Sequence, residues 1–217
     1  MNSISVEDAA IFKYVKNRPD VDDLDNVAWL DAGEISITDN WSGQPAPAGR
    51  SVKAGLLWSD AALHVRFDAV VAEPLVINSS PDVSKKTIGL WDRDVCEIFV
   101  APDRAEPNRY FEFEAAPTGE WLDVGIELKA HERLSDWCYA SGIKCSALIE
   151  ESRVLMAMEI PWQAFGRMPK PGDIWLGNLF RCVGTGAERG YLSWKATRTE
   201  HPNFHVPSAF GEFIFIK

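Results

Sequence analysis

Three glutamates on two β-rich segments have residue types and spacing that could support chemistry. Glu97 interrupts the apolar run from Val95 to Val100, and Glu112 and Glu114 alternate with aromatic residues in the next such segment. If the two segments pair as strands, period-two alternation can place all three carboxylates on one face. Buried carboxylates cost free energy unless cations, protons or ligand hydroxyls compensate them. The cluster therefore predicts either a ligand site or a buried structural Glu–Arg network.

Arginines that could pair with these glutamates are Arg93, Arg109 and Arg181. Arg181 and Asn178 both lie in an otherwise apolar strand-like segment, so we do not expect them to be simply solvated. Together with Glu97 and Glu114, they are the planar polar groups that we expect to bind a ligand.

A carboxylate pair is also the machinery of glycoside hydrolysis, in which one group is the acid and the other the nucleophile or base. Nothing in the sequence fixes their separation or assigns those roles. A glycoside hydrolase or lyase that uses Glu97, Glu112 and Glu114 therefore stays open as an alternative. The sequence has no G-x-S-x-G elbow, P-loop or H-E-x-x-H arrangement, so other common catalytic machineries have no support.

Two aromatic residues are placed where a ring could cover such a site. Trp91 lies six residues before Glu97 in a polar loop, and Phe204 lies in a long excursion near the end of the chain. Flat rings cover the C–H faces of sugars, while planar polar groups bind the hydroxyls. This combination predicts a saccharide site, and a core tryptophan beside an edge glutamate is the alternative.

An acidic segment near the start of the chain could hold a metal ion. Its aspartates are Asp20, Asp22, Asp23 and Asp25. Hard cations such as calcium require several oxygen ligands. The spacing is not that of an EF-hand loop, so a solvated acidic turn is the alternative.

The composition describes an ordinary globular chain with an acidic balance. Of 217 residues, 46% are hydrophobic and 25% charged, and the formal net charge is −10. This charge argues against nucleic acid and anionic membrane surfaces as partners. Nine tryptophans are many for this length, and such an excess suits an aromatic-lined site.

The ends and the cysteines give further expectations. Residues 1–8 lack the features of a signal peptide, and no run of about 18 apolar residues is present. A cytoplasmic location is the default expectation, or a secreted or periplasmic one if a leader has been removed. The four cysteines lack C-x-x-C spacing, which argues against zinc. Free thiols are expected, although Cys138 and Cys145 could face each other across a hairpin.

Roughly twelve strand candidates, mostly separated by short turns, predict an all-β fold. One expected hairpin joins Ser51–Trp58 to Ala62–Val71 and places His64 on a polar, solvated face. Helical turns are expected only at Asn26–Leu30 and Pro161–Gly166. This pattern is typical of an antiparallel two-sheet β-sandwich. No repeat or linker divides the chain, so we expect a single domain over residues 1–217.

Short motifs along nearly the whole chain occur in a recognisable order. They are Asp22–Trp29, Trp91–Pro102, Tyr110–Glu114 with Pro117–Gly119, Met158–Trp162, Gly177–Arg181, Ser193–Trp194, Asn203–Pro207 and Phe210–Gly211. This ordered set resembles the family 9 carbohydrate-binding modules and their relatives in the DOMON-like group. The resemblance implies a β-sandwich that binds a mono- or oligosaccharide without catalysis, in carbohydrate catabolism. It also implies structural calcium, which would suit the aspartates.

The resemblance also implies roles for single residues. Trp91 and Phe204 fall on two rings that enclose a sugar, although the second ring is tryptophan in well-known members. Glu97 falls on the acidic residue that binds sugar hydroxyls. Glu114 replaces an arginine and Phe180 a glutamine found in some members, so the pattern of hydroxyls recognised must differ. A DOMON-like scaffold that binds haem or a protein partner is a further alternative, although no Met/His pair lies on obvious facing strands.

Overall fold

The structure, a computed structural model, describes residues 9–217. Its strands are β1 (Ala10–Tyr14), β2 (Gly33–Ile37), β3 (Val52–Trp58), β4 (Ala62–Val70), β5 (Val95–Ala101), β6 (Arg109–Ala115), β7 (Trp121–Leu128), β8 (Arg133–Asp136), β9 (Lys144–Ile149), β10 (Arg153–Pro161), β11 (Ile174–Val183), β12 (Gly190–Ser193) and β13 (Gly211–Ile216). Its helical elements are the short 3-10 turns η2 (Val27–Asp31), η3 (Leu90–Asp92), η4 (Trp162–Phe165), η5 (Gly186–Glu188) and η6 (Pro207–Ala209). The prediction of an all-β fold is therefore confirmed.

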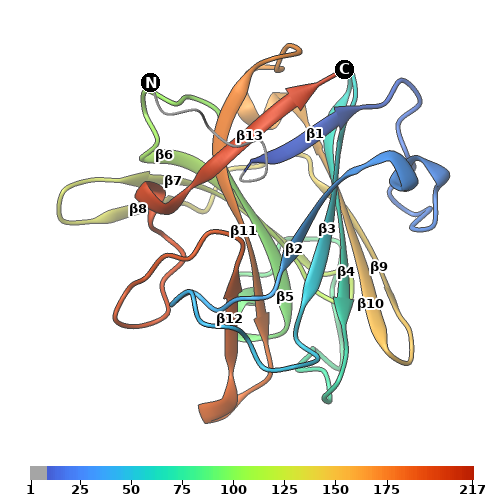
Figure 1. Cartoon of the computed structure of the whole chain (residues 1–217), viewed down its shortest axis with the longest axis vertical. Helices are drawn as coiled ribbons and strands as arrows, with labels where there is room; N and C mark the ends of the chain where they lie inside the picture. The colour runs from blue at the N-terminus through green and yellow to red at the C-terminus, as the bar shows by residue number, and fades with distance from the viewer. Residues whose placement is uncertain (1–8) are drawn as a thin grey trace.

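The strands form one continuous hydrogen-bonded path (Figure 1). Its order is β8-β7-β6-β5-β11-β13-β1-β3-β4-β10-β9, with β12 beside β11 and β2 beside β3. The division into two sheets is thus not confirmed. The prediction of purely antiparallel pairing is wrong, because β1 runs parallel to both β13 and β3. No tight hairpin joins β1 to either neighbour, so the hairpin constraint that imposes antiparallel pairing does not act on it.

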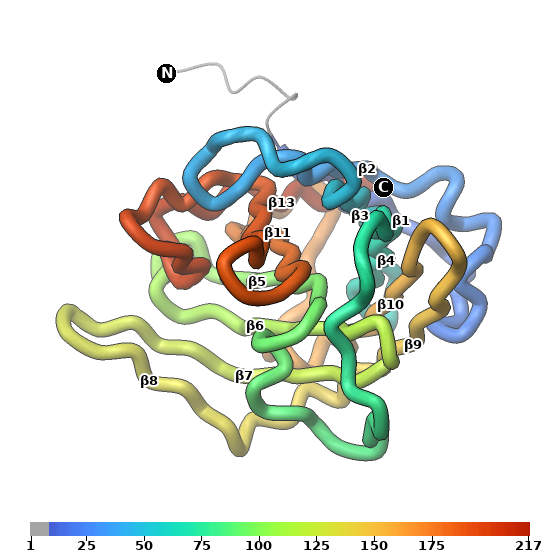
Figure 2. The backbone as a smooth tube through the Cα atoms, turned by 90° about the horizontal axis from the view of Figure 1, so that it is seen from below, coloured from blue at the N-terminus to red at the C-terminus, as the bar shows by residue number. Residues whose placement is uncertain are grey.

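The main hydrophobic core joins the two ends of this path. Seen from below, β5 to β8 lie on one side and β3, β4, β9 and β10 on the other (Figure 2). Phe67 from β4 and Phe113 from β6 belong to one buried cluster. Phe12, Trp175 and Phe215, from the strands between them, are fully buried in the same cluster.

A second apolar cluster lies on the opposite face of β5, β6, β7 and β11. Alternation directs Ile98 and Phe113 to the main core, and Phe99, Tyr110 and Phe180 to this second cluster. The second cluster also contains Phe204 from the excursion between β12 and β13. The chain thus folds its last loop over the face that carries the three glutamates.

The helical turns are more numerous than predicted. The expected turns at 26–30 and 161–166 are η2 and η4, and Gly166 ends η4 at a φ of 66°. The three turns that were missed each span three residues. Such turns are too short to show helical periodicity, because one turn of helix already takes about 3.0 residues.

His64 is not solvated, and that prediction is wrong. Its side chain is 2% exposed and lies 3.0 Å from the Ser59 hydroxyl through Nε2. The segment before β2 covers the outer face of β4 and β10: Arg18 pairs with Glu159, which stands opposite His64, and Leu24 packs on Leu155 of β10. Strand alternation alone does not reveal that cover.

The remaining expectations from the sequence concern the cysteines, membrane-spanning segments and a leader. All four cysteines are free, so the disulfide alternative for Cys138 and Cys145 is not realised. None of the helical turns within residues 9–217 is long and apolar enough to cross a bilayer. The expectation about a leader concerns residues 1–8, which lie outside the described part.

Candidate functional site

A cavity of about 320 Å³ opens on the face that carries the glutamates. Its floor consists of side chains from β5, β6 and β11, among them Glu97, Phe99 and Glu112. Its walls come from three segments that are distant in sequence. They are η3 with Trp91, the end of β8 with Trp137, and residues 202–205 with Phe204.

Two tryptophans form the exposed rim of this cavity. Trp91 and Trp137 are 36% and 37% exposed. Their ring centroids lie 6.0 Å apart and their planes are inclined by 36°. The rings therefore contact each other at an angle, and their exposed parts offer apolar surface to a ligand.

Phe204 forms a different kind of wall. Its ring stacks on Phe180 with a centroid distance of 4.1 Å and an interplanar angle of 11°. Tyr191 meets it edge-on at 6.2 Å. One face of Phe204 is thus covered by Phe180, and the side chain is only 9% exposed. Phe204 shapes the cavity as part of a packed aromatic wall.

The turn that carries Trp91 is held in place by Arg189. The guanidinium group donates hydrogen bonds to the carbonyl oxygens of Trp91 at 2.6 Å and Arg93 at 2.7 Å. It also donates to the Gly184 carbonyl at 2.6 Å. The turn begins at Gly89, whose φ of 86° favours glycine. These contacts tie Trp91 to the loop between β11 and β12.

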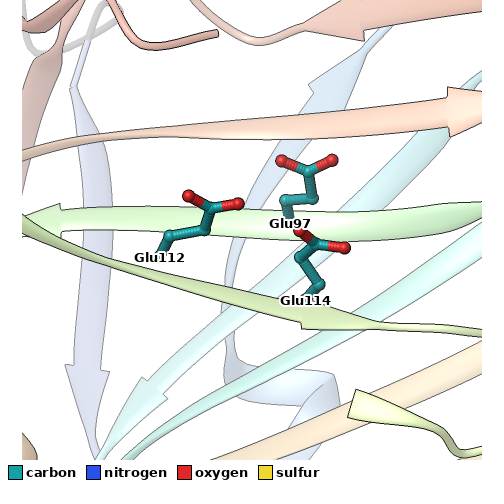
Figure 3. A group of neighbouring side chains, drawn as sticks. All are labelled: Glu97, Glu112 and Glu114. Atoms are coloured by element: carbon teal, nitrogen blue, oxygen red, sulfur yellow. The ribbon is translucent and has the colours of Figure 1, made fainter. Parts of the chain in front are cut away.

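Three carboxyl groups on neighbouring strands lie at the floor of the cavity or directly beneath it (Figure 3). Glu97 on β5 stands directly opposite Glu114 on β6, and Glu112 stands opposite Phe99. One oxygen from each glutamate lies within 4.8 Å of the others. The three side chains point to the same side of the sheet. Their exposures are 2% for Glu97, 5% for Glu112 and 0% for Glu114.

Burial controls the electrostatics of these carboxyl groups. Loss of water raises the pKa of Glu97, Glu112 and Glu114, because the charged form is disfavoured in a low-dielectric surrounding. Mutual repulsion raises the pKa of Glu97 and Glu114 further. The Cys182 thiol donates a long hydrogen bond of 3.5 Å to Glu97 Oε1. The surroundings of the floor therefore disfavour the charged form of these carboxyl groups.

His205 adds a neutral polar group to the wall. Burial and, to a smaller extent, the charge of Arg133 together lower the pKa of His205 to about 3. Its Nδ1 lies 2.8 Å from the Tyr110 hydroxyl, and its Nε2 lies 3.9 Å from Glu112 Oε2. At neutral pH this imidazole is uncharged, so it does not neutralise Glu112.

Comparison with known families identifies this arrangement. The family described as carbohydrate family 9 binding domain-like matches residues 21–217. The chain belongs to this family. No curated protein matches the chain significantly by sequence.

Solved structures share the fold of this family 9 domain. A candidate carbohydrate-binding protein from Bacteroides uniformis has a TM-score of 0.75 at 18% identity, covering 96% of this chain and 99% of its own. A family 9 module from Caldicellulosiruptor kristjanssonii in complex with cellotriose has a TM-score of 0.66 at 13% identity, covering 95% and 93%. The same organism's module in complex with glucose has a TM-score of 0.67 at 14% identity, covering 94% and 95%.

Three of the predicted site residues meet at the cavity of the family 9 domain. Trp91, Glu97 and Phe204 all line it, although Phe204 lies far from the other two in the sequence. Phe180 supports Phe204 from behind. Glu114 lies beneath the floor, since it is fully buried and does not line the cavity.

Asn178 and Arg181 are not at the cavity. The Asn178 amide donates to the Lys195 carbonyl at 2.8 Å and accepts from the Lys195 and Leu179 amides, each at 2.9 Å. Arg181 points to the opposite face of β11 and donates to the carbonyl oxygens of Arg50, Ser51 and Val70. Both side chains therefore form hydrogen bonds with backbone groups of the chain itself.

The predicted Glu–Arg network does not form around the floor. Arg93 pairs with Glu120 at 3.6 Å, and Arg109 pairs with Glu127 at 3.3 Å. Arg181 is bound to carbonyl oxygens. Across residues 9–217, none of the three arginines considered from the sequence pairs with Glu97, Glu112 or Glu114.

The aspartates of the acidic segment are exposed and form local contacts instead of a ligand cluster. Asp20 accepts a hydrogen bond from the Asp22 amide at 3.2 Å, and Asp23 accepts one from the Asn26 side chain at 2.8 Å. Within the described chain, the one acidic group close enough to share a metal is that of the three glutamates. As placed, the aspartates do not fit a calcium ion, and calcium at Asp20, Asp22, Asp23 and Asp25 stays a prediction.

Sequence reasoning missed Trp137, Tyr191, Arg133 and His205, which line the cavity. Trp137 had a usable signal. It lies in a polar stretch beside Asp136, much as Trp91 lies beside Asp92. The other three gave no local signal, because their proximity depends on the path of the loops.

Proposed function

We propose that this family 9 domain binds a saccharide non-catalytically in the cavity beneath Trp91 and Trp137. The observation that carries the proposal is that two partly exposed indole rings border a cavity whose floor bears carboxyl groups. Indole faces suit the C–H faces of a sugar ring, and carboxyl groups suit its hydroxyls. A volume of about 320 Å³ lies at the low end of the roughly 300–1,000 Å³ typical of small-molecule sites. We therefore expect a mono- or disaccharide unit inside the cavity.

Glucose and cello-oligosaccharides are the first ligands to test. The solved family 9 modules with the same fold were determined in complex with cellotriose and with glucose. The floor of this chain differs from the pattern expected for well-known members, since Glu114 replaces an arginine. Other neutral hexoses and pentoses therefore belong in the same screen.

The hydrolase or lyase alternative is not favoured. Glycosidases need one ionised and one protonated carboxyl group, whose environments push their pKa values apart. Here burial raises the pKa of all three carboxyl groups, well above the ordinary value for Glu97 and Glu114, and nothing in the described part of the site assigns an ionised partner to a protonated one. The haem or protein-scaffold alternative gains nothing from the family match.

Two further expectations from the family resemblance belong to this proposal. They are a two-layer DOMON-like arrangement of the strands and a role in carbohydrate catabolism. The core cluster shared by β4 and β6 is compatible with two facing layers.

A glycan array with the full chain tests the proposal, and Trp91→Ala is the variant that locates binding. Ile88→Ala is the matched control, since Ile88 is 60% exposed in the same segment and does not line the cavity. Saccharide binding that is lost in Trp91→Ala and kept in Ile88→Ala supports the proposal, provided that the melting temperature is preserved. Binding that survives in Trp91→Ala at full strength, or no binding by the unaltered chain, contradicts it.

A further inference from the structure

We propose that Glu97, Glu112 and Glu114 together bind one divalent cation of the calcium type at the floor of the cavity. The three side chains converge there from adjacent strands (Figure 3). The site is distinct from the acidic segment at residues 20–25. The inference does not depend on saccharide binding.

The buried carboxyl group of Glu114 is the strongest indication that a ligand binds between the three glutamates. Apart from the neighbouring Glu112 carboxyl group, no side chain or backbone group of residues 9–217 bonds to either of its carboxyl oxygens, and the side chain is 0% exposed. A buried polar group without a partner costs about 1–3 kcal/mol, and more if it is charged. Glu114 also points toward the other two carboxyl groups, since one of its oxygens is within 4.8 Å of theirs. A ligand held between the three groups would satisfy it.

The spacing suits a single ion. A point between three oxygens at most 4.8 Å apart lies no more than about 2.8 Å from each of them, close to the ~2.3–2.6 Å of calcium–oxygen bonds. Small side-chain movements close the difference. A set of carboxylate oxygens selects hard cations over soft ones.

A sugar does not replace the ion at this position. Glu114 does not line the cavity, so a ligand the size of a sugar ring does not reach it. Glu97 and Glu112 do line the cavity, which gives an ion an entry path. Two positive charges on the ion would compensate most of the charge of three ionised carboxylates.

The electrostatics of the ion-free floor agree with this role. Burial raises the pKa of all three carboxyl groups, which disfavours three negative charges there when no cation is present. A metal competes with protons for these groups, because carboxylates bind it in the ionised form. Binding should therefore release protons and tighten as the pH rises.

The test is calcium titration of the chelator-treated full chain by calorimetry, repeated with terbium while its luminescence is excited through tryptophan. Glu114→Gln is the central variant, because it keeps the shape and removes one ligand charge. Asp22→Asn/Asp23→Asn is the control that removes charge from the acidic segment. Glu112→Gln is the second variant, used if Glu114→Gln does not fold.

The expected result is one calcium ion whose affinity falls at least about tenfold in Glu114→Gln and is unchanged in Asp22→Asn/Asp23→Asn. Terbium luminescence should be lost in parallel, and the enthalpy should vary with the buffer as protons are released. Absence of calcium binding at millimolar concentration overturns the proposal. Binding that is unchanged in Glu114→Gln and Glu112→Gln, or that is lost only in Asp22→Asn/Asp23→Asn, overturns it as well.

Discussion

The indole rings of Trp91 and Trp137 contact each other with 6.0 Å between their centroids, although they belong to η3 and to the segment after β8. Each is more than one-third exposed. Exposed tryptophans that contact each other expose apolar area to water, which costs stability unless a ligand covers it. This pair is the feature that connects the fold to a saccharide-binding role.

Replacing Trp137 should weaken saccharide binding without unfolding the protein. In Trp137→Ala we expect a loss of about 1.4 kcal/mol of binding free energy, or roughly tenfold in affinity, because one half of the rim is removed. Leu134→Ala is the matched control, since Leu134 is equally exposed on β8 and does not line the cavity. Calorimetric titration measures both, and equal affinities in the two variants would show that Trp137 is not part of the site.

Arg189 should act as a positioning residue for Trp91. Arg189→Ala removes the hydrogen bonds to the carbonyl oxygens of Trp91, Arg93 and Gly184. We expect the free energy of unfolding to fall by about 1–2 kcal/mol and saccharide affinity to fall as well, because the indole loses its fixed orientation. Arg189→Lys should restore part of the affinity. An unchanged dissociation constant in Arg189→Ala would refute the positioning role.

Asn178 should contribute to stability and not to ligand contact. Asn178→Ala removes two hydrogen bonds that connect β11 to Lys195 and one to Leu179 within β11. Unfolding in urea should show a loss of about 1–3 kcal/mol, while the folded protein keeps its saccharide affinity. The opposite pattern, lost affinity with preserved stability, would restore the ligand-binding role that the sequence suggested.

The buried His64 should make the fold sensitive to acid. Burial lowers the pKa of His64 to about 4, an effect that Glu159 opposes and Arg18 adds to. The folded state therefore binds fewer protons than the unfolded chain below the ordinary pKa of about 6.5. This contribution to stability is fully present above about pH 6.5 and is lost as the pH falls toward the folded value.

Urea unfolding at several pH values measures this effect. The variant His64→Gln removes the titrating imidazole. It leaves unchanged the two neighbours of this side chain, Ser59, which contacts the imidazole, and Glu159, which stands opposite it on β10. We expect the free energy of unfolding to fall less steeply with acid in His64→Gln than in the unaltered chain. Identical slopes would mean that His64 is already charged in the folded state.

Much of the fold follows from local sequence rules. Alternation in the segment around Glu97 correctly gives the face of each side chain, so that Glu97 shares a face with Phe99 and not with Ile98. The same rule could not reveal that β1 pairs in parallel, because that pairing depends on where the first and last strands meet. It also could not reveal which outer faces are covered, which is why His64 was misplaced.

Site residues could be predicted from the sequence only where a residue type is energetically unfavourable among its sequence neighbours. Trp91 and Glu97 stand out because an indole in a polar loop and a carboxylate in an apolar strand both need a reason. Asn178 and Arg181 meet the same criterion and yet bind backbone carbonyl oxygens. Burial of a polar group therefore indicates that a partner exists, but local sequence does not tell whether the partner is a ligand or the chain itself.

The most direct measurement is the NMR response of the tryptophan indole N–H groups to a saccharide from the array screen. If the cavity holds the sugar, the signals of Trp91 and Trp137 shift on titration and saturate together. The signals of Trp58 and Trp162 stay in place, because their indole N–H groups are bonded inside the fold to Ile216 and Ser59. Binding that leaves Trp91 and Trp137 unshifted, or that shifts other tryptophans instead, would contradict a saccharide site in this cavity.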